Sequence, residues 1–174
     1  MLTQNTRILI VEDQLDTLRS LENAVRTVLP KYLPSFQRYE VARCYQEAQN
    51  AVQNNVYDLI LLDHRMPELP FVEPEVIRNG GSISDLTEEE QDKYFQQEEE
   101  NSRNSKGIGY TLISQIRQRN PQTIVIGTSS MSRELASMPR PDYQSRKFPG
   151  QAEEDLEKIL QEISLKGGLE DEKK

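Results

Sequence analysis

The sequence is short of several residue types that particular classes of protein need. It has one cysteine, Cys44, which excludes an internal disulfide and any zinc site built from several cysteines. No apolar run approaches the length of a membrane span, and the first residues lack the basic and apolar regions of a signal peptide. Basic residues number 21 against 29 acidic ones, a formal net charge of −8, whereas a nucleic-acid-binding surface needs an excess of positive charge. We therefore expect a cytoplasmic protein that binds neither nucleic acid nor a membrane.

The acidity is concentrated in one segment of the chain. Residues 68–106 hold eleven carboxylates and four basic side chains, a net charge of −7, so the remaining residues carry a net charge of only −1. The last residues, 166–174, are mostly small or charged and predict a disordered tail. The sequence therefore predicts one domain over residues 1–165, with an acidic insertion at residues 68–106 inside it.

Short apolar runs alternate with stretches of helical periodicity. Residues 8–11, 59–62 and 124–126 are apolar, which is typical of strands buried on both faces of a sheet. Tyr39 and Val41 alternate with charged residues in a further strand. Apolar residues recur at helical spacing from Leu15 to a stop at Pro30, around Ala48, from Leu112 to Ile116 and from Leu156 to Ile163. This alternation predicts an α/β fold with a doubly wound, five-stranded parallel sheet and helices on both faces.

The fifth strand and the helix before it are the least regular part of the pattern. Residues 142–149 are too polar to mark a core strand. Met131, Leu135 and Met138 have helical spacing, but Pro139 and Pro141 cut the predicted helix short.

Polar residues follow the predicted strands at the points where they end. Glu12 and Asp13 follow the first strand, Asp63 the third and Thr128 the fourth, while Lys147 lies near the fifth. The carboxyl ends of parallel strands meet at one edge, where ligands of open α/β sheets bind. Three carboxylates there repel one another unless a cation such as Mg²⁺, which prefers oxygen ligands, offsets their charge. Taken singly, each acid also fits an ordinary turn or helix cap.

These motifs resemble the receiver domain of two-component response regulators, which has a flavodoxin-like, CheY-like fold. The matching elements are the acidic pair after the first strand, the sequence Asp63-His64-Arg65-Met66-Pro67 after the third, Gly109 with Ile116-Arg117, Thr128-Ser129 after the fourth, and Lys147 near a proline. The resemblance covers nearly the whole chain except residues 68–106 and the tail.

The resemblance implies a role for each of these residues. Asp63 would be the phosphoacceptor, and Glu12 and Asp13 would be the acids of a Mg²⁺ site, with Asp13 the direct ligand. The backbone carbonyl of Arg65 would complete that site. Thr128 would hydrogen-bond the phosphoryl group and Lys147 would pair with it, while Arg65 and Ser130 stand at positions that tune how quickly the group is lost.

Two features depart from the family pattern. The family has lysine directly before proline, whereas this chain reads Lys147-Phe148-Pro149, so Arg146 is an alternative for the basic position. Tyr143 then lies one place from the position of the family's aromatic switch. The remaining candidates are assigned ordinary roles: His64 should point away from the cleft, and Cys44 should be a small packing residue at a strand end.

The insertion begins directly after the predicted phosphoacceptor loop. Thr87 and Glu90 fit a helix capping box, which predicts a helix from about Glu88 to Glu99 with Leu86, Tyr94 and Phe95 as its apolar contacts. Residues 80–82 and 101–105 suggest linkers. Either the insertion is a solvent-exposed extension of the domain, or it is a lid that restricts which phosphoryl donor reaches Asp63.

The leading interpretation is a stand-alone receiver, not an enzyme, that signals by protein–protein contact. Its expected partners are a sensor histidine kinase or phosphotransfer protein and a downstream protein target, and it would be a monomer or weak homodimer. The first alternative is a receiver-like interaction module that is never phosphorylated. The second is a haloacid-dehalogenase-type phosphatase, although that family places a second acid where this chain has Arg65.

Overall fold

The computed structural model describes residues 2, 6–33, 36, 38–69, 74–78, 81–129 and 138–167. Its centre is a five-stranded parallel sheet with the strand order β2-β1-β3-β6-β7. The three inner strands are β1 (Ile8–Val11), β3 (Leu59–Leu62) and β6 (Ile124–Gly127), and the edges are β2 (Tyr39–Ala42) and β7 (Tyr143–Gln144). The predicted doubly wound α/β fold is therefore confirmed.

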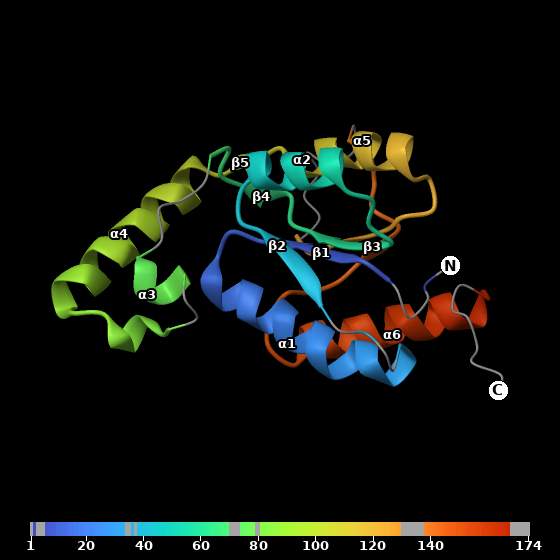
Figure 1. Ribbon diagram of the computed structural model, residues 1–174, viewed down its shortest axis with the longest axis horizontal. Coiled ribbons are helices and arrows are strands. Elements are labelled where there is room, and N and C mark those ends of the chain that lie inside the picture. The colour runs from blue at the N-terminus through green and yellow to red at the C-terminus, as the bar shows by residue number, and fades with distance from the viewer. Residues whose placement is uncertain are drawn as a thin grey trace.

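Helices cover both faces of the sheet, as Figure 1 shows. One face carries α1 (Leu15–Tyr32) and α6 (Gln151–Leu165), which pack on Ile8, Ile10 and their neighbours in one apolar cluster. The other face carries α2 (Tyr45–Asn54) and α5 (Leu112–Arg119), which pack on Leu9, Val11 and their neighbours in a second cluster. Successive residues of β1 thus serve opposite layers, which explains why this strand is apolar throughout.

The structure corrects the end of the first helix. The predicted stop at Pro30 is wrong, since α1 continues to Tyr32 with Pro30 inside it. A proline removes one N–H, and in the last turn this loss affects a single hydrogen bond. The backbone N–H of Leu33 still donates to the carbonyl of Leu29 at 2.8 Å, so the final turn closes.

The fifth strand lies within the stretch that the sequence marks as too polar for a core strand. It comprises Tyr143 and Gln144 alone, which pair with Ile126 and Gly127 of β6. Met131 and Leu135 of the predicted preceding helix lie outside the described residues, as do Gly80 in the insertion and residues 168–174 of the predicted tail.

The acidic insertion begins and ends in a small antiparallel hairpin. Its strands are β4 (Arg65–Met66) and β5 (Lys106–Gly107), in which Arg65 pairs with Gly107 and Met66 with Lys106. The described residues between them form α3 (Glu75–Arg78), the 3₁₀ turn η1 (Ile83–Asp85) and the long helix α4 (Glu88–Asn104), while a second 3₁₀ turn, η2 (Gly109–Thr111), leads from the hairpin into α5. The hairpin holds both ends of the insertion next to the loop after β3.

The predicted capping box at the start of α4 is confirmed. The backbone N–H of Thr87 donates to Glu90 Oε2 at 2.9 Å, and the N–H of Glu90 donates to Thr87 Oγ1 at 3.4 Å. The helix extends to Asn104, so most of residues 101–105, predicted as a linker, is helical instead.

The insertion packs against the first turn of α1. Leu86 and Tyr94 are buried, and they form a cluster with Ile77 and with Leu15 of α1. The third apolar contact predicted for this helix, Phe95, is wrong, because that side chain is 51% exposed. In Figure 1, α3 and α4 accordingly lie beside the point where β1 passes into α1. No helix in the described ranges is long and apolar enough to cross a membrane.

Candidate functional site

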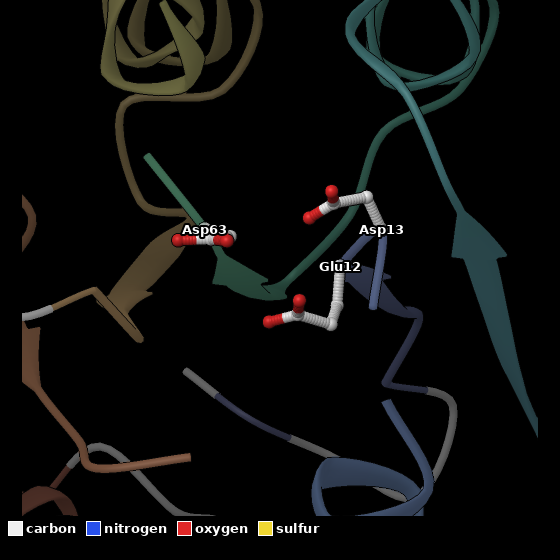
Figure 2. A group of neighbouring side chains, drawn as sticks. All are labelled: Glu12, Asp13 and Asp63. Carbon is white, nitrogen blue, oxygen red and sulfur yellow. The ribbon is translucent and has the colours of Figure 1, made fainter. Parts of the chain in front are cut away.

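Three carboxylates meet at the carboxyl ends of adjacent strands. Val11, Leu62 and Gly127 are aligned across the sheet, so the residues that follow them leave it at the same level. Glu12 and Asp13 follow β1 and Asp63 follows β3, and one oxygen of each lies within 4.8 Å of one oxygen of both others. Figure 2 shows the three side chains turned toward one another. The register of the parallel sheet therefore builds the cluster.

Lys147 connects two members of this cluster. Its Nζ donates to Glu12 Oε2 at 3.0 Å and to Asp63 Oδ2 at 2.9 Å. Both carboxylates are almost fully buried, and the Lys147 side chain is 19% exposed. An ammonium at this place compensates part of the negative charge that the sheet edge concentrates.

The other oxygen of Asp63 is held by its own loop and by the segment that follows β6. Oδ1 accepts hydrogen bonds from the backbone N–H groups of His64 at 2.7 Å and Arg65 at 3.4 Å, and from the hydroxyl of Ser129. The Asp63 carboxylate is thus fixed at both oxygens, with the lysine on one and the loop on the other.

The electrostatics of the cluster favour protonation of its carboxylates or binding of a cation. Burial, followed by the charge of Asp63, raises the pKa of Glu12 to about 7 although Lys147 opposes the rise. Burial and Asp63 likewise raise the pKa of Asp13 to about 6. Burial alone would lower the pKa of Lys147, but Glu12 and Asp63 together raise it, so this lysine stays protonated near neutral pH.

The donor set fits a hard divalent cation. It consists of carboxylate oxygens, and Asp13 Oδ1 is buried without a hydrogen-bond partner among the described residues. Mg²⁺ prefers such oxygen ligands and retains several waters. Glu12, Asp13 and Asp63 are the residues that would hold it, and it would supply positive charge to stabilise anionic oxygens beside the cluster.

The remaining predicted site residues lie around this cluster. Thr128 is buried directly after β6, and its hydroxyl has no hydrogen-bond partner within the described part of the chain. Arg65 lies in β4, two residues after Asp63, where its backbone pairs with Gly107. Ser130 lies outside the described residues.

Lys147, and not Arg146, contacts the acidic cluster. Arg146 Nε donates to Asp155 Oδ2 at 2.8 Å on the surface. Tyr143 packs on the cluster beneath α1 and α6, with the Lys166 ammonium 5.7 Å from its ring centre. Its neighbour Gln144 instead lies 3.2 Å from the hydroxyl of Tyr110.

The two residues assigned ordinary roles are both buried. The ring of His64 packs against Tyr110, with ring centroids 4.8 Å apart, rather than joining the acidic cluster. Cys44 caps α2 by accepting a hydrogen bond from the N–H of Glu47 at 3.3 Å, and burial raises the pKa of its thiol. Capping is a function of Cys44 beyond the packing role that the sequence suggests.

Four residues contribute to the site in ways that the sequence did not predict, although two of them, Ser129 and Gly109, stand among the motifs. Ser129 contacts Asp63, Ser105 donates to Asp13 Oδ2 at 3.4 Å, and Arg43 donates to the backbone carbonyl of Asp13. At Gly109, whose N–H donates to the His64 carbonyl at 2.9 Å, a Cβ would overlap the carbonyl oxygen of Asp63. Of these residues, only Ser129 and Gly109 have a sequence feature that could have indicated them. Ser129 is a polar residue just after a strand, and Gly109 is a glycine where the chain returns from the insertion to the domain.

Comparison with known proteins identifies the fold. No family model and no curated protein matches the sequence. Among solved structures, the response regulator DrrB of Thermotoga maritima, an OmpR/PhoB homolog, matches with a TM-score of 0.51 and 14% identity over 94% of this chain. A CheY-like response regulator receiver domain protein from Methanospirillum hungatei JF-1 matches with a TM-score of 0.51 and 19% identity, covering 93% of this chain and 96% of that one.

A third structure agrees with these two. The two-component transcriptional regulator AraC from Clostridium phytofermentans ISDg matches with a TM-score of 0.50 and 17% identity over 94% of this chain and 98% of that one. The chain therefore has the fold of a response-regulator receiver, CheY-like, with Glu12, Asp13 and Asp63 forming an acidic cluster at the sheet edge. It spans 54% of the length of the DrrB chain.

Proposed function

We propose that this chain is a phosphoacceptor receiver that takes a phosphoryl group on Asp63. The observation that carries the proposal is the setting of the Asp63 carboxylate. It lies between the ammonium of Lys147, at 2.9 Å, and two further acids that would hold Mg²⁺. A buried carboxylate with a fixed cation beside it and a cation site next to it suits attack on an anionic phosphoryl group.

The chemistry follows from the charges in the cleft. A carboxylate oxygen of Asp63 attacks phosphorus in line, and the bond between phosphorus and the donor nitrogen of a phosphohistidine breaks. An acyl phosphate forms on Asp63, and the donor histidine leaves with the electron pair and takes up a proton. Lys147 offsets part of the negative charge on the phosphoryl oxygens, and Mg²⁺ held by Glu12, Asp13 and Asp63 would supply further positive charge there. The Thr128 hydroxyl, which lacks a partner within the described residues, is suited to donate to one of these oxygens.

The remaining assignments belong to the same proposal. Asp13 would be the direct carboxylate ligand of Mg²⁺, with Glu12, Asp63 and the backbone carbonyl of Arg65 completing the site. The donor would be a sensor histidine kinase or a phosphotransfer protein in the cytoplasm. The phosphorylated domain, residues 1–165, would act on a protein target as a monomer or weak homodimer, without catalytic turnover.

Intact-mass measurement after incubation with Mg²⁺ and a small acyl-phosphate donor tests the proposal. The wild type should gain one phosphoryl group, and Asp63→Asn should gain none. Omitting Mg²⁺ should abolish the gain, while Asp58→Asn, outside the cleft, is the matched control and should leave it intact. If the wild type gains nothing and binds no beryllofluoride, it is an interaction module that is never phosphorylated. Steady release of phosphate from phosphate esters would instead indicate a phosphatase.

A further inference from the structure

The insertion touches the segment that carries Asp13 at two points. At the junction of α4 and β5, the hydroxyl of Ser105 donates to Asp13 Oδ2 at 3.4 Å. Two residues after Asp13, Leu15 packs into the cluster formed by Leu86, Tyr94 and Ile77 of the insertion. Ser105 and Asp13 are 92 positions apart in the sequence, so the insertion brings a distant hydroxyl to the acid cluster.

A third link runs through Arg43, which follows β2. One of its terminal nitrogens donates to the backbone carbonyl of Asp13. The same guanidinium faces Tyr94 of α4: burial raises the pKa of this phenol to about 12, and Arg43 acts against the rise. Tyr94 is only 1% exposed and also donates to Glu98 Oε1 at 2.9 Å, so its position in the insertion is well defined.

The base of the insertion is fixed to the loops around the site. The β4–β5 pairing is reinforced by an ion pair between Lys106 Nζ and Glu68 Oε2 at 2.9 Å. The backbone N–H groups of Tyr45 and Gln46 donate to the carbonyls of Pro67 and Glu68, which joins the insertion to the start of α2. Movement of α4 relative to Asp13 therefore has to break contacts at both ends.

We propose that the insertion is a clamp that sets the cation affinity of the acid cluster, with Ser105 as the positioning residue for Asp13. The proposal rests on the cation site of the proposed function and adds its regulation. Ser105 donates to Oδ2 and leaves Oδ1 buried without a hydrogen-bond partner among the described residues, so Oδ1 remains available to a cation. Because coupling between two sites is reciprocal, the cation also stabilises the insertion in its docked position.

The first test measures Mg²⁺ affinity by titration calorimetry on the full chain. Partners that orient a metal ligand typically contribute 10- to 100-fold in affinity, so Ser105→Ala should weaken Mg²⁺ binding about tenfold. Ser105→Thr keeps the hydroxyl and should restore affinity. Ser84→Ala removes an exposed serine of the same insertion and should bind like the wild type. Unchanged affinity in Ser105→Ala, an equal loss in Ser84→Ala, or no rescue by Ser105→Thr would each overturn the proposal.

The second test uses hydrogen exchange across α4 with Mg²⁺ alone as the probe. Saturating Mg²⁺ should slow exchange in residues 88–104 of the wild type, and the effect should be absent in Asp13→Asn. Exchange that does not respond to Mg²⁺ overturns the clamp. If the protein binds Mg²⁺ and Mg²⁺ protects α4 from exchange, but no phosphoryl group is gained, the clamp proposal stands and the proposed function fails. If the protein is phosphorylated normally but Ser105→Ala matches the wild type in Mg²⁺ affinity, the proposed function stands and the clamp proposal fails.

Discussion

Raising the pH of the metal-free protein from about 5 to about 8 should lower its free energy of unfolding by about 3 kcal/mol. The pKa of Glu12 is raised from 4.5 to about 7, chiefly by burial. The folded protein therefore binds more protons than the unfolded chain between these two values, and stability falls as the pH rises through them. Each tenfold change in proton affinity corresponds to about 1.4 kcal/mol, which gives about 3 kcal/mol for this group.

Asp13 also lowers the free energy of unfolding as the pH rises, in an overlapping pH range. Its pKa rises from 3.8 to about 6. Because both acids owe part of their shift to Asp63, their contributions do not simply add. Glu40 and Asp155 have lowered pKa values, so their effect is confined to more acidic solution, where stability falls as the pH falls.

Urea denaturation in EDTA, at several pH values across this range, measures the effect. Glu12→Gln removes one titrating carboxylate and should flatten the dependence, and excess Mg²⁺ should restore stability at the alkaline end. At a concentration 100 times its dissociation constant, a ligand adds about 2.7 kcal/mol, comparable with the loss. A metal-free protein that is as stable at about pH 8 as at about pH 5, or a Glu12→Gln variant that keeps the full slope, would refute the electrostatic account of the cluster.

Three further predictions concern single side chains. Lys147→Met removes the cation between two buried carboxylates and should lower the free energy of unfolding, measured with urea, by about 3 kcal/mol at alkaline pH. The loss should be smaller in acid, where Glu12 is protonated. The control Arg146→Met, at an exposed side chain, should cost under about 1 kcal/mol. Gly109→Ala should cost about 3 kcal/mol and weaken Mg²⁺ binding by displacing Asp63. Gly150→Ala is strained by its φ of 76° but has open space around it, so it should not alter Mg²⁺ binding. Thr87→Ala removes the cap of α4 and should lower the free energy of unfolding by about 1 kcal/mol, which should speed hydrogen exchange in that helix by about fivefold.

Local patterns in the sequence were sufficient to predict the sheet and its acidic edge. The runs at Ile8–Val11 and Leu59–Leu62 are apolar because both faces of each strand are covered. Their parallel pairing alone brings Glu12, Asp13 and Asp63 to one edge, so the cluster follows from a pattern that each strand carries by itself.

Contacts between distant segments could not be predicted in the same way. Tyr94 and Phe95 are adjacent aromatic residues on one helix, and only the position of Leu15 on another element decides that Tyr94 is buried and Phe95 exposed. Lys147 and Arg146 are adjacent cations in a short polar stretch where β7 pairs through two residues, so the loop geometry decides which enters the cleft. No periodicity encodes either choice.

The acidity of the insertion adds little to the charge at the cation site, although the insertion carries a net charge of −7. Most acids of α4 are exposed, and two of them pair along the helix, Glu89 with Lys93 and Glu99 with Arg103. Solvent and salt screen such exposed charges within about 8 Å. The group that the insertion presents to Asp13 is the hydroxyl of Ser105. The charged group next to Tyr94 of the insertion is the guanidinium of Arg43. The insertion thus keeps its negative charge in solvent and contributes a neutral donor to the site, which is the arrangement that a clamp on a cation ligand requires.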